Sequence, residues 1–116
     1  MKQLSSPVSC CESILVLCTC PDNNVAEALA LALVERKLAA CVNITGSIQS
    51  IYRWEDKINK DKEVLLLIKT TQKAWKLLEQ TLLELHPYDV PEIIALPIVA
   101  GSQDYLSWVG ENVCVN

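Results

Sequence analysis

Residues 13–37 read SILVLCTCPDNNVAEALALALVERK, an apolar run that ends at a proline and is followed by a helix-forming segment. The run Ser13–Cys20 is rich in Ile, Leu and Val, which predicts a buried strand. Asp22 follows the proline and can cap free backbone N–H groups at a helix start. We therefore predict a helix over about Asn23–Lys37. Its surface is apolar nearly all round, which indicates close packing on a sheet or a second face against another subunit.

Two further strands are predicted, joined as an extended hairpin. Cys41–Tyr52 is rich in β-branched residues, and Gly46 within it suggests a bulge or a bend. Glu63–Thr70 contains a continuous apolar run, which implies burial on both faces. The far end of the hairpin carries Tyr52 and Trp54 and is expected to project past a small domain.

The rest of the chain is predicted to form a helix, a strand and a short helix. The helix over Gln72–Leu85 has an apolar stripe at spacings of three and four, which includes Leu85. It ends at His86-Pro87, since the residue before proline disfavours the helical region. A strand over Pro91–Val99 and a helix over Gln103–Gly110 follow. This order predicts an α+β fold, a ferredoxin-like split βαβ sandwich with an extended β-hairpin and a short C-terminal helix.

The composition fits one small domain that shares apolar surface with a partner. The chain has 116 residues, a net charge of −4 and 51% hydrophobic residues, and a domain of this size leaves much of its surface exposed. We predict a flexible N-terminal tail over residues 1–12, a single domain over residues 13–111 and a C-terminal tail over residues 112–116. The acidic charge argues against a nucleic-acid partner.

No apolar segment reaches the ~18–20 residues that a membrane span requires. No export signal is evident either, because the polar N-terminal residues interrupt any apolar core. We therefore expect no membrane insertion, a cytoplasmic location and reduced thiols.

Candidate site residues are few. The sequence has no Walker A loop, no GxGxxG motif, no GxSxG motif and a single His, His86, whose place at a helix end favours a structural cap. Cys18 lies at the exit of a buried strand, where ligands tend to bind; its alternative role is a small buried hydrophobe. We expect Cys20 to face away from Cys18 unless the strand breaks at Pro21. A redox enzyme that uses both thiols is disfavoured, because no cations cluster near them and Asp22 opposes thiolate formation.

Three other residues are candidates for contacts with a ligand or a partner protein. Glu92 opens the last predicted strand, where a carboxylate must find a partner or solvent. Tyr52 and Trp54 are expected to anchor a protein interface, where aromatic side chains are enriched. The aromatic residues are too scattered for a base-stacking platform.

Several blocks of this sequence together resemble the CutA family, the divalent-ion tolerance proteins. They span about Ser13–Glu111 and read VLCTCPD (16–22), KLAACVN (37–43), SIYRWEDKI (50–58), KT (69–70), HPYDVPEI (86–93) and DYLSW (104–108). The resemblance is specific because the blocks occur in order over nearly the whole domain. It implies a tight homotrimer in which the long hairpins pair between subunits, and it implies no catalytic activity.

The resemblance also implies a role in tolerance to copper and other divalent cations. Some members have a copper site built from a Cys of the first strand, a His before a Pro-Tyr pair and a Glu after the second Pro. Cys18, His86 and Glu92 match these positions. Where such members have two His residues before Pro-Tyr, this chain has Leu85-His86, and Leu85 is expected to face the core.

The family trimer is similar to that of the PII signalling proteins, which implies an alternative role in signalling or small-ligand binding. Lys69, Tyr105 and Trp54 would then line a pocket between subunits, and Tyr52 and Trp54 would lie in the trimer interface. We thus predict a non-enzymatic homotrimer that takes part in tolerance of divalent ions and binds copper or another divalent cation, or else a PII-like ligand-binding trimer.

Overall fold

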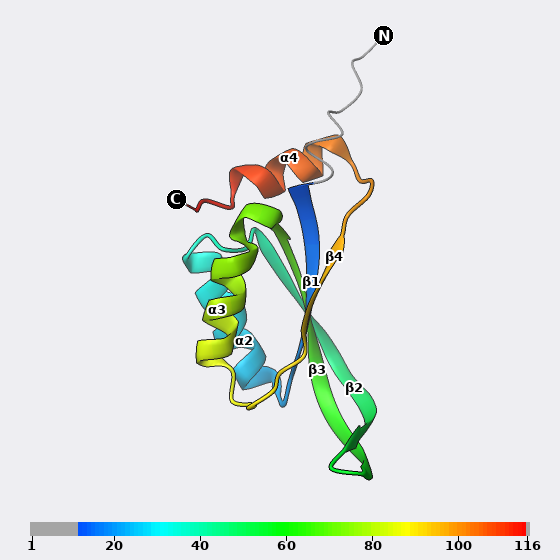
Figure 1. Ribbon diagram of the computed structural model, residues 1–116. Coiled ribbons are helices and arrows are strands. Elements are labelled where there is room, and N and C mark those ends of the chain that lie inside the picture. The colour runs from blue at the N-terminus through cyan, green and yellow to red at the C-terminus, as the bar shows by residue number, and fades with distance from the viewer. Residues whose placement is uncertain (1–11, 116) are drawn as a thin grey trace.

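The computed structural model describes residues 12–115 and shows one sheet with two helices packed on one face (Figure 1). Residues 1–11 of the predicted N-terminal tail lie outside the described part. In chain order the elements are β1 (Ser13–Cys20), α2 (Asn23–Glu35), β2 (Cys41–Trp54), β3 (Lys57–Thr71), the 3-10 helix η1 (Gln72–Ala74), α3 (Trp75–Leu85), β4 (Ile93–Pro97) and α4 (Gln103–Glu111). The predicted α+β class and order of elements are confirmed.

The sheet is antiparallel, with strand order β2-β3-β1-β4. β1 lies inside it, so that Cys18 is paired with Leu66 of β3 on one side and with Ile93 of β4 on the other. A strand with two neighbours has its backbone N–H and C=O groups hydrogen-bonded on both edges, which suits the apolar composition of β1. The register of β2 on β3 shifts between residues 44 and 47, which confirms the irregularity predicted at Gly46.

β2 and β3 extend beyond the rest of the sheet as a two-stranded arm, defined here as residues 47–64. β1 pairs with β3 no further than Val64, whereas β2 and β3 stay paired as far as Trp54. At the tip, Glu55 and Asp56 have φ angles of 51° and 63°, as a two-residue hairpin turn with positive φ at both central positions requires. The predicted projecting hairpin is therefore present, and it gives a molecule 56 Å long and about half as wide.

The core lies between one face of the sheet and helices α2 and α3. α2 contributes Ala26, Leu29 and Leu33, which recur at spacings of three and four. Leu31, on the other side of this helix, is 58% exposed. In the single chain α2 therefore has one buried face, as the interpretation of packing on the sheet requires. The largest fully buried side chains of this core include Val16, Leu33, Leu66, Ile68, Leu78 and Leu82.

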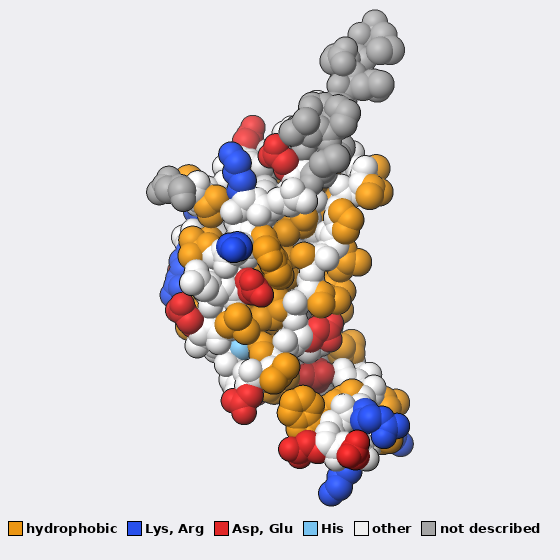
Figure 2. All heavy atoms as spheres, in the orientation of Figure 1, with side chains coloured by type: hydrophobic (Ala, Val, Ile, Leu, Met, Phe, Trp, Pro, Cys, Tyr) orange, Lys and Arg blue, Asp and Glu red, His pale blue; other side chains and the backbone are white. Residues whose placement is uncertain are grey.

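The opposite face of the sheet is apolar and is not covered by α2 or α3. We call it the open face, and it carries Leu15, Leu17, Leu65, Leu67, Ile94 and Leu96. The register places Leu17 between Leu67 and Ile94, so these side chains form one continuous surface. Ile94 is 49% exposed and Leu96 is 41% exposed. In Figure 2 hydrophobic side chains run along the β4 side of the molecule.

The prediction that Leu85 faces the core is wrong. Leu85 is 44% exposed, whereas Leu78, Leu82 and His86 are buried. These three residues are spaced by four along the chain, so the inward-facing stripe of α3 passes through His86 and not through Leu85. The backbone N–H of His86 still donates to the carbonyl of Leu82 at 2.8 Å, which holds His86 in line with the helix.

Asp22 caps α2 as predicted, with its Oδ1 accepting the Val25 N–H at 2.9 Å. Asp22→Ala is therefore expected to lower the free energy of unfolding by about 1 kcal/mol, because the first turn loses a hydrogen bond and a favourable charge. Urea unfolding followed by circular dichroism measures this change. Asp22→Asn keeps the acceptor and should remain close to the original protein; an equal loss in both variants would contradict this role.

The C-terminal segment is attached to the domain as far as the structure describes it. The Cys114 N–H donates to the Lys37 carbonyl at 2.9 Å, and Val115 packs against the core. α4 lies across one end of the sheet (Figure 1).

Among residues 12–115, no helix combines the length and the apolar character needed to cross a membrane.

Candidate metal centre

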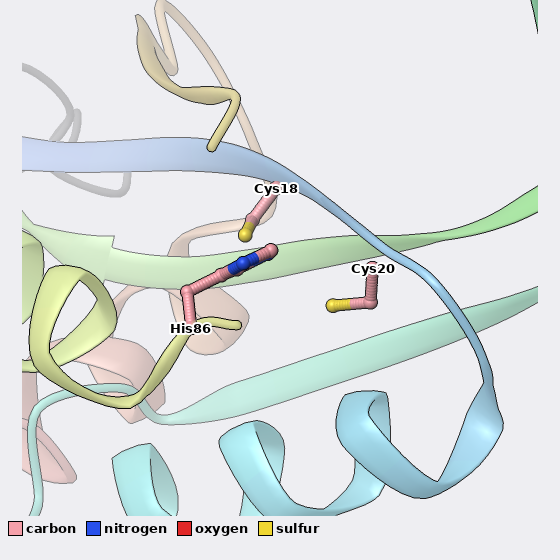
Figure 3. A group of neighbouring side chains, drawn as sticks. All are labelled: Cys18, Cys20 and His86. Carbon is pink, nitrogen blue, oxygen red and sulfur yellow. The ribbon is translucent and has the colours of Figure 1, made fainter. Parts of the chain in front are cut away.

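Three buried side chains with metal-binding atoms meet between β1 and the end of α3. One ligand atom from each of Cys18, Cys20 and His86 lies within 4.8 Å of the other two (Figure 3). Both cysteines are fully buried and His86 is 7% exposed. β1 supplies the two thiols, and the residue that ends α3 supplies the imidazole. Within the described chain this is the one group of three such residues that could hold an ion.

The expectation that Cys20 faces away from Cys18 is wrong. Side chains alternate along a strand, so residues two apart share a face, and both thiols point from β1 toward the helices (Figure 3). Thr19, between them, lies on the other face. Cys20 is thus a candidate site residue that the sequence analysis did not predict. The alternation of side chains between the two faces of a strand is the signal that identifies it.

His86 is held by backbone groups at both ring nitrogens. Its Nδ1 accepts the Tyr88 N–H at 3.1 Å, which requires that nitrogen to be unprotonated. The proton is therefore on Nε2, which donates to the Thr19 carbonyl at 2.8 Å. His86 was predicted to cap the helix end; its ring instead bonds Thr19 of β1 and Tyr88, so its structural role is to join the end of α3 to the sheet. An ion on either ring nitrogen would displace one of these partners and leave the other in place to orient the ring, as the second hydrogen bond of a metal-binding His does.

The two thiols interact with each other and with nearby acidic groups. A hydrogen bond between them raises the pKa of Cys18, together with burial, and the same bond lowers the pKa of Cys20. The charges that act on these thiols come from Glu63, Glu92 and Asp22, and all of them are negative. The surroundings therefore favour a cation beside the sulfur atoms.

Glu92 lies apart from this group of ligand atoms. Its side chain is exposed and lines a groove of about 600 Å³ between the arm and residues 88–92. Thr19 lines the same groove, on the face of β1 opposite to the two thiols. Tyr88 closes one side, where its hydroxyl donates to Glu63 Oε2 at 2.8 Å. The structure thus brings Cys18 and His86 together. The third member of their group is Cys20, whereas the family resemblance implied Glu92.

Of the three residues predicted to line a ligand pocket, Lys69 and Tyr105 both lie near Cys41, and Trp54 lies apart from them in one chain. Lys69 lies in the sheet opposite Cys41, and Cys41 also acts on Tyr105, whose pKa is raised by burial and by this neighbour. Trp54 lies at the far end of the arm, where it and Tyr52 are half exposed. Trp54 lines the groove beside Glu92 instead.

A family model described as CutA1 divalent ion tolerance protein matches residues 14–112. The chain belongs to this CutA1 family. It is 52% identical over 98 residues to the divalent-cation tolerance protein CutA of Thermus thermophilus, covering 84% of this chain and 95% of that protein. It is 50% identical to the protein CutA homolog of Xenopus laevis, over 82% of this chain and 63% of that protein.

Solved CutA1 structures have the same fold. A divalent cation tolerance protein of Thermus thermophilus superposes with a TM-score of 0.86 at 50% identity, over 88% of this chain and 99% of that one. CutA1 of Oryza sativa superposes with a TM-score of 0.89 at 41% identity, over 93% of this chain and 99% of that one. The family description and both Thermus thermophilus names refer to divalent-ion tolerance, and none of these names states a reaction. A CutA structure from Archaeoglobus fulgidus is titled periplasmic, which is said of that protein.

Proposed function

We propose that this CutA1 protein is a non-enzymatic homotrimer that contributes to metal-ion tolerance by binding copper or another divalent ion directly. The observation that carries the proposal is the meeting of Cys18 and His86, buried and surrounded by acidic charge, in a chain whose relatives are named for cation tolerance. Thiolate and imidazole are the ligands that copper and zinc prefer over oxygen donors. The site is therefore suited to these ions and not to magnesium or calcium.

The spacing of the ligand atoms is compatible with one ion. Two sulfur atoms on a zinc ion are roughly 3.8 Å apart, given Zn–S bonds of about 2.3 Å. Ligand atoms that already lie within 4.8 Å of one another need to approach by at most about 1 Å. The ion would offset the negative charge of the thiolate and of nearby Glu63.

The trimer is supported by apolar surface that one chain leaves uncovered. The open face extends across β3, β1 and β4, and an exposed apolar patch of this kind marks a protein interface. The arm adds Tyr52 and Trp54, which are half exposed. We also infer a cytoplasmic location, because the cysteines at the site are free and a reducing compartment keeps them so.

Equilibrium dialysis tests direct binding. The chain carries six cysteines, so the experiment uses a full-length form in which Cys10, Cys11, Cys41 and Cys114 are replaced by Ser, here called the two-cysteine chain. We expect it to retain one zinc ion per subunit. Cys18→Ser in this form should lose that ion. Unchanged stoichiometry in the Cys18→Ser form would reject this site.

A further inference from the structure

We propose that Cys20, and not Glu92, is the third protein ligand, so that two thiolates and one imidazole select a soft closed-shell divalent ion such as Zn²⁺ or Cd²⁺. This inference rests on the proposed direct binding of metal. It adds a ligand and a preference among ions that the family resemblance does not imply.

The position of the side chains favours Cys20. Cys18 and Cys20 lie on the same face of β1, point into the same space and are both fully buried (Figure 3). Their sulfur atoms and a ring nitrogen of His86 already form one group. Glu92 is exposed and borders the groove with Thr19, on the other face of the strand. A carboxylate in that place would have to move around β1, or pull the thiols out of the core, to share an ion with them.

The charge balance determines the kind of ion. When an ion binds, each thiol releases its proton to solvent, so that the pair carries two negative charges beside a neutral imidazole. A divalent ion makes this set neutral, whereas a monovalent ion leaves one negative charge in the core. Since the acidic groups Glu63, Glu92 and Asp22 act on the thiols, a remaining negative charge would be opposed both by them and by burial.

The softness of the donors narrows the choice further. Thiolate sulfur discriminates against Mg²⁺, Ca²⁺ and Mn²⁺, which prefer oxygen ligands. Zn²⁺ and Cd²⁺ have filled d shells and no preferred geometry from d electrons, so they accept whatever arrangement the rigid strand provides. Both ring nitrogens of His86 have backbone partners, the Thr19 carbonyl at Nε2 and the Tyr88 N–H at Nδ1. The ion must displace one of these partners, so we expect His86 to shift when it binds.

Cadmium titration of the two-cysteine chain tests the third ligand. The ultraviolet charge-transfer absorption of a cadmium–thiolate bond counts the thiolates on the ion, and dialysis gives the number of ions and the affinity. We expect one ion per subunit with an absorption that corresponds to two thiolates. Cys20→Ala should halve the absorption per bound ion and weaken binding by at least about tenfold, since even indirect partners of a metal change its affinity roughly 10–100-fold. Glu92→Gln should match the unaltered form.

The outcomes separate this inference from the proposed function. If the two-cysteine chain binds no ion, direct binding itself is rejected. If Cys18→Ser removes the ion, direct binding stands. The assignment of Cys20 as the third ligand is then overturned if Cys20→Ala keeps the full absorption, or if Glu92→Gln abolishes binding. Preference for Cu⁺ over Cd²⁺ in a competition at equal free concentration would overturn the charge-balance argument. Circular dichroism and thermal melting verify folding, and Cys20→Ser, which keeps the size of the side chain, replaces Cys20→Ala if that form does not fold.

Discussion

Ile94→Glu is expected to convert the proposed trimer to a monomer. Ile94 lies on the open face in register with Leu17 and is 49% exposed in one chain, so a glutamate there meets water in the monomer. In a trimer that covers this face, three carboxylates would be buried without partners, and an unpaired buried charge is strongly unfavourable. Light scattering should therefore report a mass near the 12.9 kDa of one chain, against three times that value for the original protein.

The matched control is Leu31→Glu. Leu31 is 58% exposed on the outer side of α2, away from the open face, so the same charge there should leave the mass of the assembly unchanged. If Ile94→Glu keeps the trimeric mass, or if the original protein is itself monomeric at micromolar concentration, then the open face is not the surface that joins the subunits.

Leu33→Ala is expected to lower the free energy of unfolding by about 2–5 kcal/mol. Leu33 is fully buried between α2 and the sheet, and its truncation removes apolar contacts and leaves a cavity in a closely packed core. Such a loss is a large part of the ~5–15 kcal/mol that stabilises a typical domain. Urea unfolding at one fixed protein concentration measures it, and the fixed concentration matters because subunit association adds to the apparent stability.

Leu31→Ala provides the comparison at a site two residues away. The same atoms are removed from a side chain that is 58% exposed, so little burial is lost and the change should stay within about 0.5 kcal/mol. Equal losses in the two variants would show that α2 is buried on both sides, as the second interpretation of its apolar sequence requires.

Local chemistry was sufficient to predict most of the elements. The apolar run before Pro21 predicted a strand, and Asp22 predicted the start of a helix. The continuous apolar run within Glu63–Thr70 predicted a strand buried on both faces, and this strand has a neighbour on each side. These assignments succeed because a strand or a cap depends on neighbours along the chain. The arm was also foreseen, since the two hairpin strands are longer than a small domain can cover.

The errors concern the direction in which side chains point. Leu85 fits an apolar stripe by spacing, but α3 directs His86 inward instead and leaves Leu85 exposed. Cys20 was placed on the wrong side of its strand, although the alternation of side chains places it beside Cys18. Glu92 follows the family motif in sequence, and its role as a ligand stays a prediction; in the described chain it is not part of the group formed by Cys18, Cys20 and His86.

The amino-acid sequence alone was enough to establish the class of fold, the family resemblance and the candidacy of Cys18 and His86, because each rests on residue type and spacing along the chain. Which side chains share one buried space was decided by the tertiary structure. Cys18 and His86 are 68 positions apart, and they meet because β1 lies inside the sheet and α3 ends above it. Proximity of that kind depends on how strands and helices pack, and no local pattern encodes it.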